Sequence, residues 1–154
     1  MKRLLTFSAI LIFITVTAVL PVLASPADDA KTLVNKAIDY IKANGKDKSF
    51  ADITSGKALR KGQLYVFVVS SDYIGLAHGG SPALVGKPIG DLKDASGRLF
   101  LKEMVDKGMK NGEGWIDYSW ANPVSKKIEQ KTTYVKLLDD KSIVGCGYYK
   151  EKKN

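Results

Sequence analysis

Hydrophobic residues between positions 28 and 44 recur with the spacing of an amphipathic helix, and lysines and Asp39 lie on the opposite face. Pro26 precedes the segment, and Asn44 with Gly45 supplies a stop signal at its end. We therefore expect a helix over about 28–44 that packs on a sheet. Six apolar residues form its packing face: Ala30, Leu33, Val34, Ala37, Ile38 and Ile41.

Beyond residue 62 the pattern changes to short apolar runs that are typical of strands. The run from Leu64 to Val69 is almost continuously apolar and β-branched, which indicates a strand buried on both faces. The element order predicts an α+β domain with a five-stranded antiparallel sheet, whose sheet core spans about 62–149. Further strands are expected at 73–78, 115–120, 128–138 and 143–149.

The segments between these strands are less regular. Residues 46–61 are polar and contain enough apolar positions for one short packed helical segment. Residues 79–94 form a loop rich in glycine and proline, and loops of that length often cover a site. A second helix is expected to begin at Asp94 or Ser96 and to run to about Met109.

The N-terminal sequence predicts export. The stretch Leu4–Leu20 is almost wholly apolar, follows two basic residues and precedes small residues at Val22–Ala24. This is the pattern of a secretory signal peptide over residues 1–24, which leaves a single domain over 25–154. A retained N-terminal membrane anchor is the alternative, although the apolar run is shorter than the ~20 residues of a spanning helix. We expect a soluble periplasmic or secreted protein.

Composition and charge narrow the possible partners. The net charge is +8, but export argues against nucleic acid, and the lysines are scattered except for a cluster at 150–153. The single cysteine, Cys146, cannot form an internal disulfide and lies in an apolar strand pattern. We therefore expect it to be a small buried hydrophobe.

The residues available for chemistry favour binding over catalysis. One histidine and one cysteine cannot build a His/Cys metal cluster, and no phosphate-binding loop or nucleophile elbow occurs. We expect no cofactor and no enzymatic activity, with a hydrolase that uses His78 as its base as a less favoured alternative. His78 ends a strand, where it either bonds nearby backbone or donates a hydrogen bond into a pocket beneath the following loop.

The segment Gly112–Tyr134 is the most informative part of the chain. It predicts two antiparallel strands joined at Asn122-Pro123, and the first carries both tryptophans. Lys131 lies near the middle of the second strand, where a cation beside aromatic side chains suits a small anion. Buried there, Lys131 needs an anionic partner, which is either a ligand carboxylate or Asp117 on the neighbouring strand.

Strand alternation divides these residues between two faces. Lys131 shares a face with Thr133, whereas Tyr134 points to the other side. Tyr118 and Trp120 share a face with each other. Only part of the segment can therefore line one pocket.

Taken in order, several motifs resemble the single Cache domain family, the extracytoplasmic PAS-like sensor modules of bacteria and archaea. The likeness covers about Gly62 to Tyr149. It rests on the runs QLYVFVVS, IGLAHGGSPALVGKPIGDLKDASGRLF, GEGWIDYSWANP, KTTYVKLL and IVGCGYY.

The resemblance implies a PAS-like fold with a long N-terminal helix on one face of a central five-stranded antiparallel sheet. It also implies a ligand pocket on the opposite face, used for short carboxylates, amino acids or related metabolites in sensing and chemotaxis. Family members usually sit between two membrane helices of a receptor, whereas this chain resembles a free-standing exported form. The pocket candidates that the resemblance assigns are Lys131, His78, Tyr118, Trp120, Tyr134, Phe67 and Tyr65.

These observations together predict an exported domain that binds a small organic anion. Lys131 is expected to pair with the ligand carboxylate, with hydrogen bonds from His78 and Tyr118 and with Trp120 and Phe67 as walls. Tyr134 can join Lys131 in one pocket only if a bulge intervenes. A protein-interaction module that docks on a membrane-bound sensor or transporter is the alternative function.

Overall fold

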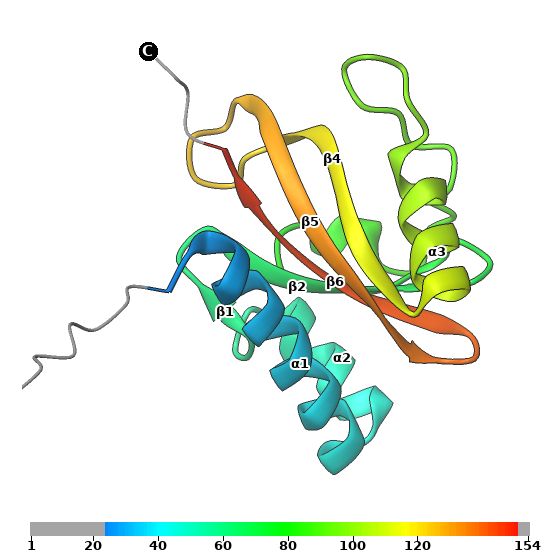
Figure 1. Cartoon of the computed structure of the whole chain (residues 1–154). Helices are drawn as coiled ribbons and strands as arrows, with labels where there is room; N and C mark the ends of the chain where they lie inside the picture. The colour runs from blue at the N-terminus through cyan, green and yellow to red at the C-terminus, as the bar shows by residue number, and fades with distance from the viewer. Residues whose placement is uncertain (1–23, 151–154) are drawn as a thin grey trace, which may run out of the picture.

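An antiparallel sheet forms the centre of the fold in the computed structural model, which describes residues 24–150 (Figure 1). Its path runs β1-β2-β6-β5-β4, and β3 pairs with β2 at residues beyond β1. The predicted α+β class and the five antiparallel strands are confirmed, and β1 is an additional two-residue strand. The strands are β1 (Arg60–Lys61), β2 (Leu64–Ser70), β3 (Gly75–His78), β4 (Glu113–Ala121), β5 (Ile128–Asp139) and β6 (Ser142–Tyr149).

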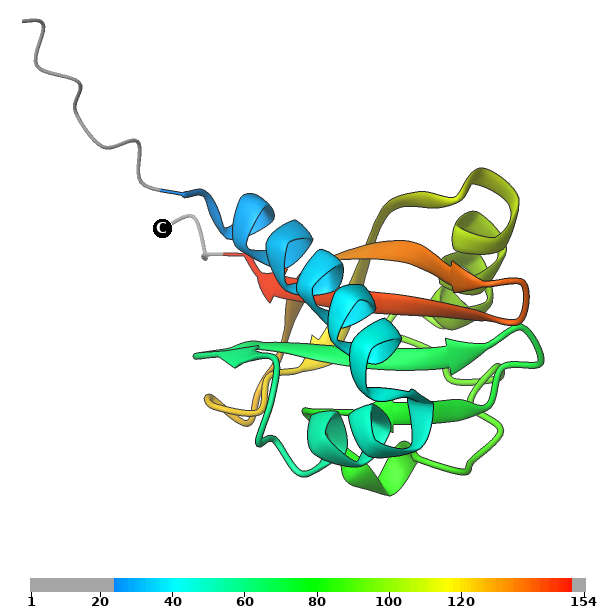
Figure 2. The same cartoon turned by 90° about the horizontal axis from the view of Figure 1, so that it is seen from below.

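The N-terminal helix α1 (Pro26–Asn44) lies across one face of the sheet (Figure 2). It begins two residues before the predicted start because Ser25 caps it: Ser25 Oγ accepts a hydrogen bond from the backbone N–H of Asp28, and the Asp28 carboxylate accepts from the Ser25 N–H. The expected short helical segment after it is α2 (Lys46–Thr54).

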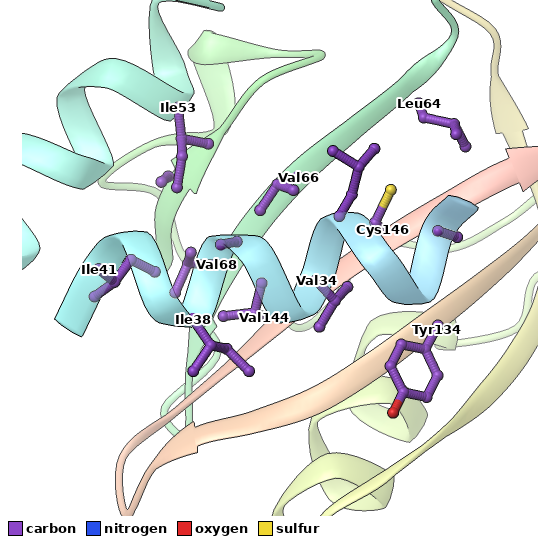
Figure 3. Close-up of a cluster of buried hydrophobic side chains, with 14 residues drawn as sticks. Val34, Ile38, Ile41, Ile53, Leu64, Val66, Val68, Tyr134, Val144 and Cys146 are labelled. Carbon is purple, nitrogen blue, oxygen red and sulfur yellow. The ribbon is translucent and has the colours of Figure 1, made fainter. Parts of the chain in front are cut away.

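The face of the sheet under α1 holds a helix-side core, which Figure 3 shows in close-up. All six apolar residues predicted for α1 are buried in it. Cys146 is completely buried there, as predicted for a small hydrophobe. Residues of the sheet in this core include Leu64, Val66, Val68, Ala77, Tyr134, Val144 and Cys146.

The opposite face of the sheet is covered by α3 (Phe100–Asn111) and by the loop after β3, which includes the 3-10 turn η1 (Pro82–Leu84). The predicted start of α3 at Asp94 or Ser96 is wrong. The Asp94 carboxylate accepts the N–H groups of Ser96 and Arg98 and so closes a turn instead of capping a helix. The helix consequently begins at Phe100, and buried Phe100, Leu101, Met104 and Val105 form its packing face.

Three chain segments meet at one end of the sheet. The start of α1 is joined to β1 by an ion pair between Asp29 and Lys61, with 2.7 Å between Nζ and the carboxylate. Tyr149 at the end of β6 donates a hydrogen bond of 2.8 Å from its hydroxyl to the backbone oxygen of Ala121, where the β4–β5 turn begins.

The predicted signal peptide falls almost wholly on residues outside the described range. None of the helices described within residues 24–150 is long and apolar enough to cross a membrane.

Candidate ligand site on the α3 face of the sheet

A small cavity lies between the sheet and the cover formed by α3 and the loop after β3. Its volume is about 20 Å³, which is enough for roughly one water molecule. Five residues from the sequence-based candidate set line it: Tyr65, Phe67, His78, Tyr118 and Trp120. The rest of the lining is apolar and comes from β2, the loop and α3: Val69, Leu84, Ile89, Leu92, Phe100, Leu101 and Met104.

Lys131 lies directly behind the Tyr65 side of this cavity and is completely buried. Its Nζ donates a hydrogen bond of 2.7 Å to the Tyr65 hydroxyl and lies 3.9 Å from the centre of the Tyr65 ring. The Tyr149 ring centre is 5.0 Å away. No carboxylate within the described residues forms an ion pair with Lys131, so burial lowers its pKa to about 7.

The alternative pairing of Lys131 with Asp117 is wrong. Strand register places Tyr118 opposite Lys131 and Asp117 opposite Thr132, so Asp117 lies on the other face of the sheet. There its carboxylate accepts a hydrogen bond of 2.5 Å from Thr132 Oγ1 and forms an ion pair with Lys150. Lys131 is left with neutral aromatic neighbours.

Two glycines of β6 make space for the side chains that reach over that strand. A Cβ atom added at Gly147 would lie 2.8 Å from Lys131 Cε and closer still to the Thr133 hydroxyl. A Cβ atom added at Gly145 would collide with the Phe67 ring. Gly inside a strand often marks a place where another group approaches the backbone closely. The alternating glycines of IVGCGYY are therefore a signal in the sequence for these contacts, and the sequence-based candidate set did not use it.

His78 bonds nearby backbone, which is the first of its two expected roles, and its ring also lines the cavity. Its Nδ1 accepts hydrogen bonds from the backbone N–H groups of Gly80 and Ser81, at 3.2 and 2.8 Å. The neutral ring therefore carries its proton on Nε2, and this ring lines the cavity beside Tyr65 and Phe67. Burial, and then the neighbouring Lys131, lower the pKa of His78 to about 4.

The protonation state of His78 determines how well this side chain could act as the base of a hydrolase. At neutral pH the His78 ring is uncharged, and its one accepting nitrogen is already occupied by backbone donors. A general base needs a free lone pair and a pKa near the working pH. His78 is therefore suited to donating a hydrogen bond from Nε2 and poorly suited to removing a proton.

Tyr118 and Trp120 wall the cavity together with α3. The Tyr118 ring stacks on Phe100 with 4.3 Å between centroids and 7° between planes, and Trp120 packs against the same Phe100 ring at 5.2 Å. The Tyr118 hydroxyl shares a buried hydrogen bond of 3.2 Å with Thr133 Oγ1, and burial raises the pKa of Tyr118. The candidate set from the sequence does not include Phe100, Met104 or Tyr149.

Tyr134 does not join the other candidates, which corrects its place in the predicted pocket. The pairing of β5 continues without a bulge from Lys131 to Tyr134, so alternation sends Tyr134 to the α1 face (Figure 3). Its ring packs against Trp115, with 5.2 Å between centroids, and its hydroxyl donates a hydrogen bond of 2.6 Å to Glu113.

The assembled site combines hydrogen-bonding polar groups with apolar walls. It contains one buried amine, one imidazole N–H and three phenolic hydroxyls, of Tyr65, Tyr118 and Tyr149. Among the described residues, no Asp or Glu lines the cavity. Among residues 24–150 there is also no group of three or more His, Cys, Asp or Glu placed to hold a metal ion.

Comparison with known families agrees with this geometry. The model of the family described as Single Cache domain 2 matches residues 25–152 and therefore includes every helix and strand described here. The chain belongs to the single Cache domain family. This match confirms the predicted family and its PAS-like fold. Cache domains are extracytoplasmic sensor domains that bind small molecules.

Solved structures of chemosensory proteins share the fold. A methyl-accepting chemotaxis protein from Vibrio parahaemolyticus RIMD 2210633 is 23% identical, with a TM-score of 0.69 over 80% of this chain and 87% of that one. A structure described as the structural basis for carboxylic acid recognition by a Cache chemosensory domain is 22% identical to this chain. Its TM-score is 0.69, and the match covers 81% of this chain and 93% of that one. A periplasmic sensor domain of a chemotaxis protein is 26% identical, with a TM-score of 0.67 over 82% and 95%.

Proposed function

We propose that this Cache domain is an exported sensory module that binds a short monocarboxylate between the sheet and α3. The observation that carries the proposal is Lys131, a completely buried amine beside an apolar cavity with no carboxylate partner among the described residues. A buried lysine without a counter-charge is costly for a fold. A ligand carboxylate would supply the missing charge.

The lining of the cavity favours a monocarboxylate over an amino acid or a dicarboxylate. An amino acid also brings an ammonium group, and no acidic side chain in the described part of the chain lines the cavity to receive it. A dicarboxylate brings a second negative charge, and Lys131 is the one buried lysine or arginine among residues 24–150. The aromatic and aliphatic walls suit a short apolar remainder. The solved Cache domain described as recognising carboxylic acids supports the ligand class.

Binding must enlarge the cavity, because about 20 Å³ does not hold a carboxylate with its carbon chain. The Tyr65 side chain separates the cavity from Lys131 and provides the hydroxyl that Nζ now contacts. We expect the ligand carboxylate to replace that hydroxyl at Nζ as Tyr65 shifts. His78 would then donate its Nε2 hydrogen to the second carboxylate oxygen.

The energies are sufficient for moderate affinity. Charge-assisted hydrogen bonds contribute about 1.5–3 kcal/mol each, and two such bonds with apolar burial support binding in the micromolar range. Export to the periplasm or the medium places the domain where it meets such metabolites. We propose that signalling then proceeds through a membrane-bound sensor or transporter partner.

Calorimetric titration tests the proposal. Purified protein is titrated with acetate, propionate and pyruvate, then with alanine and succinate, and each titration is repeated with Lys131→Met. We expect saturable binding of at least one monocarboxylate that Lys131→Met abolishes. Lys150→Met is the matched control, because Lys150 pairs with Asp117 on the other face and should not affect affinity. Unchanged affinity in Lys131→Met, or tighter binding of alanine or succinate, would overturn the proposal.

A further inference from the structure

The turn between β4 and β5 exposes two large apolar side chains. Val124 is 59% exposed and Ile128 is 62% exposed, and within residues 24–150 they are the large hydrophobic residues that stand out in this way. Single exposed hydrophobes are ordinary, but two that flank one short turn form a local apolar surface. We name this surface, with Lys126 and Lys127 between the two residues, the hairpin tip.

The conformation of the hairpin tip is fixed by Asn122, which is buried beneath it. Asn122 Oδ1 accepts the N–H groups of Val124 and Ser125, at 2.8 and 3.4 Å. Its Nδ2 donates to Gln63 Oε1 and to Glu129 Oε2, at 2.8 and 2.7 Å. All hydrogen-bonding groups of this amide are therefore used, and they fix the backbone of the turn at Val124 and Ser125.

The charge around these two apolar residues is basic. Lys126 and Lys127 are exposed, and neither forms an ion pair within the described residues. Lys150 lies at the end of β6, where its backbone N–H donates to Gln130 of β5, and its side chain forms the ion pair with Asp117. In the sequence Glu151, Lys152 and Lys153 follow. Lysines that flank apolar side chains suit a surface that presents negative charge above an apolar layer.

The position of the hairpin tip adds an independent argument. Tyr149 bonds the backbone of Ala121, and Lys150 and Asp28 line one shared groove, so the tip lies at the end of the domain where α1 begins. The chain that precedes α1 contains the apolar stretch Leu4–Leu20. This stretch engages a membrane during export, and it does so permanently if it is retained. Where the stretch is retained, the hairpin tip lies at the end of the domain nearest to the bilayer.

We infer that the hairpin tip docks on the surface of an anionic lipid bilayer, with Val124 and Ile128 entering the headgroup boundary and Lys126 and Lys127 contacting lipid phosphates. This contact would hold the Cache domain with its α1 end toward the membrane, and it is independent of the ligand proposed above. Each lysine near an anionic bilayer strengthens association by roughly fivefold. Replacing both lysines by glutamate should therefore weaken binding by at least about tenfold.

A fluorescent probe at the hairpin tip tests this contact. In the full chain, as the producing cell exports it, Ser125→Cys carries an environment-sensitive dye, since the native Cys146 is buried. The control label is Asp140→Cys, at the β5–β6 turn and therefore at the other end of β5. Vesicles contain either phosphatidylcholine alone or phosphatidylcholine mixed equally with phosphatidylglycerol.

We expect a blue shift at position 125, but not at position 140, on vesicles with phosphatidylglycerol, and a loss of this shift at high salt. Lys126→Glu with Lys127→Glu, and separately Val124→Ser with Ile128→Ser, should each weaken the response while leaving the thermal unfolding temperature unchanged. Equal responses at the two labels, equal responses on the two vesicle types, or full binding by both variants would overturn the inference. An interaction with a protein partner alone would produce no response to vesicles.

Discussion

Lys131 Nζ lies 2.7 Å from the hydroxyl oxygen of Tyr65, so the buried cation of the candidate site is held by a neutral phenol. Burial lowers the pKa of Lys131 to about 7 and raises the pKa of Tyr65, which favours the uncharged form of each. Tyr65 lines the apolar cavity, and Lys131 lies at its hydroxyl with no carboxylate partner among the described residues. The proton content of this pair should respond to any anion that binds there.

The affinity for a monocarboxylate should depend on pH above neutrality. Because the pKa of Lys131 in the free protein is about 7, the ligand finds the amine charged at lower pH and must recruit a proton at higher pH. We expect the dissociation constant to be nearly constant from about pH 5.5 to 6.5 and to rise roughly tenfold per unit above about pH 7.5. Calorimetry in buffers of different ionisation enthalpy should show uptake approaching one proton near pH 8. Affinity that stays flat through this range would show that Lys131 does not carry the ligand charge.

Stability should depend on pH in the opposite direction. Between about pH 7 and 10.4 the unfolded chain keeps the Lys131 proton and the folded protein does not, so the free energy of unfolding rises with pH there. The slope from this group is about 1.4 kcal/mol per pH unit. Lys131→Met should therefore stabilise the ligand-free protein by a few kcal/mol at pH 7, with a gain that shrinks toward pH 10.

Urea unfolding of the two proteins at several pH values measures this difference. Lys136→Met is a suitable control, because the Lys136 side chain is about one-third exposed and should change stability little at any pH. A Lys131→Met variant that is less stable than the parent at pH 7 would contradict the assigned cost of the buried amine.

The strands could be predicted from the sequence because their signals are local. Runs such as the one from Leu64 to Val69 carry their own continuous apolar and β-branched character, and the structure places β2 there. The start of α3 could not be predicted in this way, because an aspartate has the same preference for a helix cap as for a turn. Only the surrounding chain decides that Asp94 bonds Ser96 and Arg98 in a turn.

The candidate site was predictable in part for the same reason. Alternation alone separates Tyr134 from Lys131, and the pairing of β5 agrees with it. Which partner Lys131 contacts depends on Tyr65, a residue 66 positions away in the sequence, and on a register that local pattern does not determine. The small volume of the cavity is likewise a property of packing between distant elements.

Gly147 should be intolerant of any side chain. A methyl group there would meet Lys131 Cε, Thr133 Oγ1 and the backbone oxygen of Thr132, and the backbone cannot give way without disturbing the β5–β6 pairing. We expect Gly147→Ala to destabilise the protein by about 1–3 kcal/mol and to weaken ligand binding by displacing Lys131. Gly112→Ala is the comparison, since its position is open and only its positive φ is unfavourable. Both variants can be followed by denaturant unfolding and calorimetry, and equal ligand affinities would argue against a role for Gly147 in placing Lys131.

The two faces of the sheet can be distinguished by a pair of conservative substitutions. His78→Phe keeps a ring beside Tyr65 and Phe67 but removes the Nε2 donor and the Nδ1 acceptor of two backbone N–H groups. We expect ligand affinity to fall by about tenfold to a hundredfold, with a loss of stability of about 1–3 kcal/mol.

Tyr134→Phe removes only a hydroxyl that bonds Glu113 on the α1 face, so it should cost about 1 kcal/mol of stability and leave the dissociation constant unchanged. Calorimetry at one pH compares both variants directly. Because both substitutions reduce stability, a general loosening of the fold would weaken binding in each, whereas a site confined to the α3 face is affected only by His78→Phe. A fall in affinity with Tyr134→Phe equal to that with His78→Phe would place the ligand elsewhere.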